Sequence, residues 1–593
     1  MRGSIDRWGW LGAWACVACV APRRMPEAPQ RAGAPNVIVV VTDDQGYGDF
    51  GCHGNTLIDT PRLDAFAAEC PKIARFYVSP VCSPTRASLM TGRWNYRTRV
   101  VDTYVGRSQM EPDEVTLAEA LHAGGYRTGI FGKWHLGDAY PMRPMDQGFD
   151  TSLVLRGGGL AQPADPIENG RRYTDPVLIE DGVPVATTGY CTDVYFERAH
   201  RFIESSLAAG QPFFAYIATN APHGPLHDVP ADLYAKYSAR DLRAAARTDG
   251  RAPTAKELDD IARIYAMNEG IDRAFGALLD HLDARRATRD TIVVFMSDNG
   301  PEPGRQVAGL RGAKTSVYEG GIRSPLWVRW PGHLDPGTTV THPAAHVDLF
   351  PTLLELCAVA APRGVALDGR SLAPLLRGAD VAWEERALVL QSHRGDVPQA
   401  GHHFALIHAP WKLVRPSGFG REVAPGEAPF ELFDLDEDPG ETRDLAGAAP
   451  ARVAALRAEY DAWFQDVATT RPDNFAPPRI FPGGPNVPCT VLTHQDWSVR
   501  QGDGWGRNGC WHLGFEREVK LQAALLFREP RAVERVLVRF GAGQAPLTIE
   551  LGGERARYDL GALAFPAGAV EFELECAQGD ARFGPYQVEL VRP

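Results

Sequence analysis

The feature that most constrains this fold is a series of apolar runs separated by amphipathic segments. The runs predict strands of a sheet that is buried on both faces, at 36–44, 126–132, 212–220, 291–300 and 324–330. Between them, residues 113–125 and 268–284 have the apolar spacing of helices. This order predicts an α/β fold with a large mixed, mostly parallel sheet flanked by helices.

The pattern changes twice toward the C-terminus. Apolar runs from residue 388 onward, followed by an amphipathic segment at 451–467, predict a smaller antiparallel sheet with one helix. A Pro- and Gly-rich stretch then leads into short alternating runs with glycine turns, which are typical of a β-sandwich. We therefore expect a main α/β domain at 35–385, an α+β subdomain at 386–468, a linker at 469–488 and an accessory β-sandwich at 489–593.

Residues 1–34 have the outline of a secretory signal. Arg2 and Arg7 precede an apolar run at 8–21, which is followed by Pro-rich polar sequence. We expect export to the periplasm or the extracellular space, and lipid anchoring through Cys16 or Cys19 stays open. After this segment no apolar stretch reaches the roughly 18 residues of a membrane helix, so we expect no transmembrane span in the mature body.

The charge and the cysteines narrow the function. With a net charge of −12 and no block of Lys or Arg, the surface would repel nucleic acid, and an anionic substrate would need a dedicated basic pocket. Ten cysteines in 593 residues are too few for a disulfide framework. Because no C-x-x-C pair has a matching second pair, a structural zinc site is not expected either.

Two of the predicted strands end in adjacent oxygen-bearing side chains. Asp43 and Asp44 close the first strand, and Asp298 and Asn299 close the fourth. Each pair alone is also typical of a turn or a helix cap. In open α/β sheets, however, ligands gather beyond the carboxyl ends of the strands, where these groups would be pooled. Hard oxygen ligands of this kind suit Ca²⁺ and, less well, Mg²⁺.

Cys82 lies within the stretch SPVCSPTRASLMTGR. A phosphatase loop would require Arg six positions after the cysteine, where this chain has Ser88, and nothing around Cys82 fits a papain-like nucleophile. A buried free cysteine near the start of a helix running from about Thr85 remains open.

The residues around this cysteine resemble the signature of the type I, formylglycine-dependent sulfatases, arylsulfatase-like members of the alkaline phosphatase superfamily. Cys82, Pro84, Thr85 and Arg86 are in register with that signature, as is Thr-Gly-Arg at 91–93. Thr85 stands where Ser is commoner. Further segments are similar to the family's metal, lysine, histidine and C-terminal motifs, at 43–55, 132–137, 221–225, 297–300, 309–325 and 431–446.

The resemblance implies a sulfuric ester hydrolase with the following site. Ca²⁺ would be held by Asp43, Asp44, Asp298, Asn299 and residue 82, with Cys82 converted to Cα-formylglycine by a formylglycine-generating or sulfatase-maturing enzyme. Arg86 would fix the hydrated residue 82 and balance the carboxylates. Lys133, His223 and Lys314 would bind the substrate, and the catalytic residues would be Cys82, Arg86, Lys133, His135, His223 and Lys314.

The resemblance also implies roles in proton transfer. Asp298 would act as a base in the attack on sulfur, His223 or Lys314 would protonate the leaving alcohol, and His135 would act as a base in the release of sulfate. The expected substrate is a sulfated carbohydrate.

Two other functions stay open: a phosphate or phosphonate ester hydrolase of the same superfamily, and a non-catalytic protein that binds sulfated glycans. Residues 150–189, rich in Gly and Pro, are expected to form loops over the pocket. In the predicted sandwich Trp497, Trp505 and Trp511 are expected to pack in a core against the catalytic unit rather than to stack on sugars. The segment 434–440 looks like a calcium loop but has Pro439 where an EF-hand requires Gly, so we expect a turn.

Overall fold

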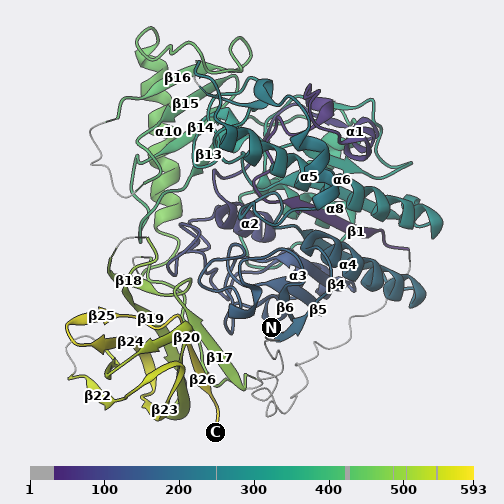
Figure 1. The fold of residues 1–593 in the computed structure, drawn as a ribbon. Helices are drawn as coiled ribbons and strands as arrows, with labels where there is room; N and C mark the ends of the chain where they lie inside the picture. Colours follow the sequence, from purple (N-terminus) through teal and green to yellow (C-terminus); the bar gives the residue numbers. More distant parts are fainter. Residues whose placement is uncertain are drawn as a thin grey trace.

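A computed structural model describes residues 33–248, 250–420, 428–473, 475–484, 487–502, 504–541 and 545–593 (Figure 1). Nearly all of the expected export segment, including Cys16 and Cys19, lies outside these residues. Within them, no helix combines the length and apolar character that crossing a membrane would need.

The centre of the main α/β region is an eight-stranded sheet, counted over the described residues. Its five central strands are parallel, and the strands at both edges are antiparallel. The expected mixed, mostly parallel sheet is therefore confirmed. The strand order is β10 (Leu326–Arg329), β9 (Thr291–Ser297), β1 (Asn36–Thr42), β8 (Phe213–Ala218), β4 (Arg127–Lys133), β5 (Thr151–Leu155), β6 (Val177–Glu180) and β7 (Val183–Ala186).

Helices cover both faces of this sheet (Figure 1). The side chains of β1 alternate between two apolar cores, with Val39 on one face and Ile38 on the other, which is why its sequence is apolar throughout. The Val39 face packs against α2 (Cys82–Thr91), α3 (Leu117–Ala123), α8 (Leu349–Leu356) and α9 (Ala373–Leu376). The Ile38 face packs against α1 (Pro61–Ala68), α4 (Cys191–Ala208) and α6 (Ala255–Ala284), and α5 (Ala231–Ser238) packs on α6.

The register of the parallel strands brings four strand ends to one edge of the sheet. Thr42 pairs with Ser297, and Gly132 pairs with Ala218. The residues that follow β1, β9, β4 and β8 therefore emerge side by side. This edge is where ligands gather in open α/β sheets.

Part of the segment 150–189 differs from its prediction as loops. Residues 151–155 form β5, and residues 177–180 and 183–186 form β6 and β7, which extend the main sheet. The intervening residues 156–176 do form a connection over the strand ends. The strands were missed because none of them has more than five residues, and because β6 and the edge strand β7 are partly exposed.

The smaller antiparallel sheet was predicted correctly. It consists of β13 (Leu388–Gln391), β14 (Phe404–His408), β15 (Trp411–Arg415) and β16 (Glu431–Asp434), and α10 (Pro450–Ala468) packs on it through Leu456 and Tyr460. The remaining short elements are α7 (Glu319–Ile322) and two ladders that pair β2 (Lys72–Ile73) with β11 (Thr339–Val340) and β3 (Phe76–Tyr77) with β12 (Ala344–Ala345).

The C-terminal residues form two antiparallel sheets around one apolar core, as predicted. Trp497 and Trp511 are fully buried in that core and Trp505 packs against it, so these rings do pack rather than stand open to solvent. One sheet contains β17 (Cys489–Thr493), β26 (Gln587–Val591), β20 (Val519–Ala532) and β23 (Glu554–Phe565). The other contains β18 (Ser498–Gln501), β19 (Asn508–Phe515), β24 (Gly568–Gln578), β21 (Arg535–Arg539), β22 (Leu547–Glu550) and β25 (Ala581–Phe583).

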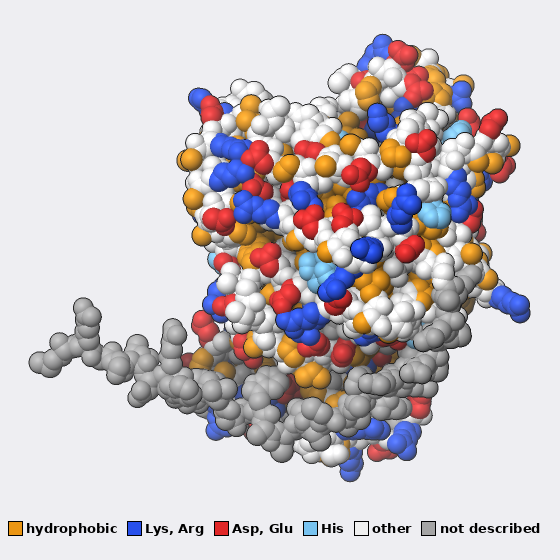
Figure 2. Space-filling view, turned by 90° about the vertical axis from the view of Figure 1, so that its right-hand side faces the viewer, with side chains coloured by type: hydrophobic (Ala, Val, Ile, Leu, Met, Phe, Trp, Pro, Cys, Tyr) orange, Lys and Arg blue, Asp and Glu red, His pale blue; other side chains and the backbone are white. Residues whose placement is uncertain are grey.

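On the face of the molecule drawn in Figure 2, basic and acidic side chains are interspersed. The clustering of charge that matters for chemistry lies instead inside the molecule, at the shared edge of the strands.

Candidate active site

Cys82 is the first residue of α2 and is buried, with 3% of its surface exposed. The helix therefore begins three residues earlier than the expected start near Thr85. Pro84 is tolerated there because a proline in the first turn removes no helical hydrogen bond. The Thr85 hydroxyl accepts a hydrogen bond from the Ser79 amide at 2.9 Å, which ties the preceding loop to the helix start. Burial raises the pKa of the Cys82 thiol to about 12, so the unmodified thiol is a poor nucleophile near neutral pH.

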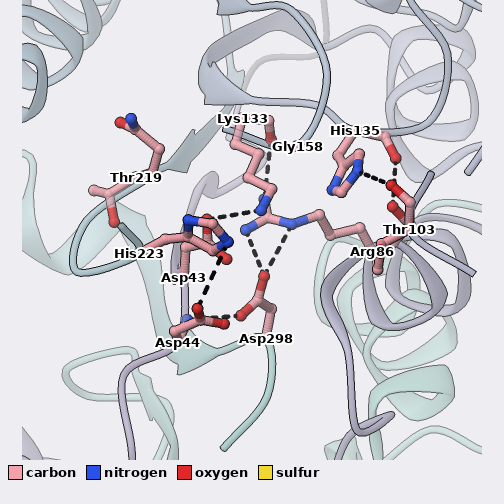
Figure 3. Close-up of polar contacts among 12 residues, drawn as sticks. Asp43, Asp44, Arg86, Thr103, Lys133, His135, Gly158, Thr219, His223 and Asp298 are labelled. Atoms are coloured by element: carbon pink, nitrogen blue, oxygen red, sulfur yellow. Dashed lines mark hydrogen bonds and ion pairs between the residues drawn. The ribbon is translucent and has the colours of Figure 1, made fainter. Parts of the chain in front are cut away.

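Two carboxylates at the strand ends form buried ion pairs beside Cys82 (Figure 3). Lys133 Nζ lies 2.7 Å from Asp43 Oδ2, and both side chains are fully buried. Arg86 donates to Asp298 Oδ2 from Nε at 3.1 Å and from Nη2 at 2.7 Å. The remaining Arg86 nitrogen, Nη1, donates to the Lys133 carbonyl at 3.0 Å, which links α2 to the end of β4.

Asp44 is held by four neighbours. Its amide donates to Asp298 Oδ1 at 3.2 Å, and Asn299 Nδ2 donates to its Oδ1 at 2.7 Å. Lys314 Nζ lies 2.7 Å from Asp44 Oδ2, and His223 Nε2 lies 3.8 Å from the same oxygen. Asp44 has a φ of 64°, a left-handed conformation that Asp tolerates better than most residues. This turn lets Asp43 and Asp44 both face the site.

The donor set fits a hard divalent cation. The Cys82 sulfur and one oxygen each from Asp43 and Asp298 all lie within 4.8 Å of one another. Among the described residues, Asp43 Oδ1 and Asn299 Oδ1 are buried without a hydrogen-bond partner. A buried oxygen in this state costs free energy unless something binds it. These two oxygens, together with the carboxylates of Asp44 and Asp298, match the ligands that Ca²⁺ takes in proteins.

His135 is buried and follows β4 with a φ of 60°. Its Nε2 lies 2.7 Å from the Thr103 carbonyl, which only accepts, so Nε2 carries the hydrogen. Its Nδ1 is buried and, within the described part of the chain, has no hydrogen-bond partner. Gly158 lies against the same ring: a Cβ there would come within 2.5 Å of Nε2. Figure 3 shows the imidazole between Thr103 and the side of the site formed by Lys133 and Arg86.

The charge states of the buried lysines and histidines suit an anionic substrate. Burial opposes the charge of Lys133 and Lys314, but Asp43 and Asp44 respectively raise the pKa of each above its usual range, so both stay protonated. Burial, assisted by the nearby Lys314, lowers the pKa of His223 to about 4, and burial lowers the pKa of His135 well below its usual range. Both imidazoles are therefore neutral near neutral pH and able to accept a proton.

The three carboxylates differ from one another. Burial, and then the charge of Asp43, raises the pKa of Asp298 to about 6. Burial also raises the pKa of Asp43 despite the charge of Lys133. For Asp44 the effect of burial is outweighed by Lys314 and His223, which hold its pKa below the usual range. The carboxylates therefore repel one another, and a bound cation would stabilise their charged forms.

All the side chains named from the sequence lie at this strand edge: Asp43, Asp44, Cys82, Arg86, Lys133, His135, His223, Asp298, Asn299 and Lys314. Sequence reasoning missed Thr103, Gly158 and Glu302, the last of which lies 2.9 Å from Lys314 Nζ. None of these three carries a local signal, because each acts through a contact with a residue distant in the sequence. The segment 434–440 is a turn at the end of β16, as expected.

Comparisons with known proteins agree on the family. Residues 35–359 match the sulfatase family model, and residues 313–460 match the model of the C-terminal region of N-sulphoglucosamine sulphohydrolase. Human (Homo sapiens) arylsulfatase A is 32% identical over 466 residues, covering 72% of this chain and 87% of that protein. N-acetylgalactosamine-6-sulfatase of Canis lupus familiaris is 30% identical over 480 residues, covering 72% of this chain and 84% of that protein.

The solved structures agree as well. The crystal structure of Ps i-CgsB superposes with a TM-score of 0.62 at 27% identity and covers 73% of this chain and 93% of that one. The phosphonate monoester hydrolase SpPMH from Silicibacter pomeroyi, at 23% identity and a TM-score of 0.56, shares the fold. Because the sulfatase model covers more than half of the sequence and the strand-edge site carries the signature around Cys82, this chain belongs to the sulfatase family, the enzymes that hydrolyse sulfate esters.

Proposed function

We propose that this enzyme removes sulfate from a sulfated carbohydrate, with Ca²⁺ bound at Asp43, Asp44, Asp298, Asn299 and residue 82. The observation that carries the proposal is the pair of unpartnered buried oxygens, Asp43 Oδ1 and Asn299 Oδ1, next to the start of α2. The carbohydrate class is supported by the relatives: one is named N-acetylgalactosamine-6-sulfatase, and Ps i-CgsB was also solved in complex with k-i-k-neocarrahexaose.

Residue 82 would work as Cα-formylglycine. The raised pKa of the thiol argues against the cysteine itself as the nucleophile. Converted residue 82 would supply hydroxyl groups for the attack on sulfur, and Ca²⁺ would supply positive charge at the sulfate oxygens. Arg86, held by Asp298 and the Lys133 carbonyl, would orient residue 82.

Lys133 and Lys314 would bind the sulfate group. Each ammonium group now lies 2.7 Å from a carboxylate of the proposed metal set. A divalent cation that takes these carboxylate oxygens leaves the charge of both lysines available to an anionic substrate. The negative net charge of the chain makes such a local basic pocket necessary.

Three groups would move protons. Asp298, with its pKa near 6, would accept the proton of the attacking hydroxyl. Lys314 Nζ, or His223 Nε2 once that imidazole has taken up a proton, would donate to the leaving alcohol, and His135 Nδ1 would accept a proton during sulfate release. The unpartnered state of His135 Nδ1 supports this last assignment, because that nitrogen has a lone pair to offer.

Export and maturation complete the proposal. We infer that residues 1–34 direct the chain to the periplasm or the extracellular space and that a formylglycine-generating or sulfatase-maturing enzyme converts Cys82. We also propose the division into a catalytic domain at 35–385, a subdomain at 386–468, a linker at 469–488 and a sandwich at 489–593. The breaks lie between the sheets of the fold.

The test assays the enzyme on a panel of defined sulfated saccharides beside an aryl sulfate and an aryl phosphate. Mass spectrometry of the peptide containing residue 82 first establishes the fraction that carries formylglycine. We expect sulfate release from at least one saccharide, in proportion to that fraction. Faster turnover of the aryl phosphate would favour the phosphate or phosphonate ester hydrolase instead. An unconverted thiol in the native host would favour the non-catalytic glycan-binding protein.

A further inference from the structure

The turn at residues 493–497, between β17 and β18, brings the C-terminal sandwich into contact with residues around the proposed active site. Gln495 and Asp496 in this turn are buried against the main α/β region, each with 2% of its surface exposed. The matched family models end at residue 460, so this contact comes from outside the region they cover. The contact is therefore a property of this chain that the family match does not describe.

Gln495 contacts the carbonyl that holds His135. Its Nε2 donates to the Thr103 carbonyl at 2.9 Å and to Ser108 Oγ at 3.0 Å, which uses both hydrogens of the amide. The carbonyl of Thr103 can only accept, so the amide nitrogen rather than its oxygen must face it. Thr103 thus accepts two hydrogen bonds on its two lone pairs, one from Gln495 and one from His135.

The two donors converge without bonding to each other. Gln495 Nε2 lies 3.5 Å from His135 Nε2, and both nitrogens carry hydrogen. Gly158 closes another side of the imidazole, since a Cβ at that position would overlap the ring. The Nε2 edge of His135 is therefore enclosed by Thr103, Gly158 and Gln495, while Nδ1 keeps its lone pair.

Hydrogen bonds on several sides hold the turn that presents Gln495. The Gln495 amide donates to Thr493 Oγ1 at 3.1 Å, and the Gln495 carbonyl accepts from the Gly106 amide at 2.8 Å. Gln109 Nε2 donates to Asp496 Oδ1 at 3.0 Å, and the next residue, Trp497, is fully buried in the core of the sandwich. The sandwich core therefore fixes the position of the Gln495 amide.

We propose that Gln495 is a positioning residue for His135: it holds the Thr103 carbonyl so that His135 donates from Nε2 and keeps Nδ1 free to accept a proton. This inference rests on the proposed role of His135. If Gln495 has this role, the sandwich is part of the catalytic unit, because it helps to orient His135, which lies 360 positions earlier in the sequence.

The decisive variant is Gln495→Leu, which keeps the approximate size of the side chain and removes both donors. We expect kcat on an aryl sulfate, normalised to formylglycine content, to fall about tenfold at unchanged KM, because one buried hydrogen bond to the Thr103 carbonyl is lost. Gln495→Glu, which also lacks the amide hydrogens, should give a fall at least as large. If Gln495→Leu does not fold, Gln495→Glu carries the test.

Gln109→Leu is the matched control. It removes a hydrogen bond across the same interface but touches neither Thr103 nor His135. It should lower Tm by as much as Gln495→Leu while leaving kcat within about twofold of the wild type. An equal fall of kcat in both variants would show that only the strength of the interface matters, and would overturn the proposal.

Two further measurements test the positioning role of Gln495 separately from the proposed sulfatase activity. In a His135→Ala background the effect of Gln495→Leu on kcat should vanish, since it acts through His135; an effect of the same size there would refute it. Hydrogen exchange of the backbone at residues 101–108 should be faster in Gln495→Leu than in Gln109→Leu. If the converted enzyme cleaves no sulfate ester, the proposed function fails, and unchanged exchange at 101–108 would separately reject the positioning role.

Discussion

The proposed Ca²⁺ site predicts that Asp43→Asn lowers the free energy of unfolding in two ways. It breaks the ion pair with Lys133, and it weakens the stabilisation by bound Ca²⁺. Asp43 and Lys133 are both fully buried, 2.7 Å apart. Without Ca²⁺ the substitution leaves a buried ammonium group without its charged partner, which costs about 3–5 kcal/mol. With Ca²⁺ the wild type should gain about 2.7 kcal/mol at a free concentration of 100 Kd, because the ion binds only the folded state. The substitution removes one charged ligand, so this gain should shrink in the variant.

The assay is urea denaturation of wild type and variant, with a chelator and with a fixed excess of free Ca²⁺. The matched control is Asp348→Asn. Asp348 is another fully buried carboxylate, paired with Arg386 and accepting from the Arg370 amide at 2.8 Å, away from the strand edge. It should destabilise the protein equally in both media and keep the full Ca²⁺ gain. A full Ca²⁺ gain in Asp43→Asn, or none in the wild type, would refute the metal assignment.

Three further predictions follow from the same geometry. Cys82→Ser should lower turnover of an aryl sulfate at least about a thousandfold. The control Cys52→Ser, at an exposed cysteine, should keep the turnover of the wild type. Equal activities of the two variants, with the mass of residue 82 checked in both, would exclude Cys82 as the source of the nucleophile. Lys314→Met should lower kcat/KM about 10- to 100-fold through loss of a charge-assisted hydrogen bond. The control Lys256→Met, at an exposed lysine, should leave kcat/KM unchanged. Similar kcat/KM values for the two variants would show that Lys314 does not bind the substrate. Burial lowers the pKa of His346 to about 3, so between pH 6.5 and about 3 only the unfolded state binds this proton, and this imidazole alone lowers stability by about 1.4 kcal/mol for each unit by which the pH falls. His346→Gln should flatten this slope in urea denaturation at stepped pH, and an unchanged slope would contradict the assignment.

The sequence predicts the central strands well because each is a short apolar run that ends in polar residues. The same pattern locates Asp43, Asp44, Asp298 and Asn299, since parallel strands end at a common edge and the register pairs Thr42 with Ser297. Lys133 was found only through its motif, because a single lysine after a strand carries no signal of its own. Here the family resemblance added what periodicity could not.

Other parts could not be predicted from local patterns. The strand β6 and the edge strand β7 are short and partly exposed, so their alternation is too weak to tell them from loops. The helix α2 begins at Cys82 rather than near Thr85, and the sequence does not mark this start because Val81, the N-cap residue, makes no side-chain cap. Thr103 and Gln495 act through contacts 32 and 360 positions from His135 in the sequence, which no window of residues can reveal.

The burial of α2 bears on whether residue 82 could be converted before or after the chain folds. All ten residues of this helix are buried, and its first residue lies beneath two ion pairs that join segments more than 80 positions apart. An enzyme that converts Cys82, as we propose, would need access to this residue, which the folded protein buries. The proposed conversion of residue 82 would therefore have to precede folding, and a molecule that folds with an unconverted thiol would stay inactive for as long as the native state persists.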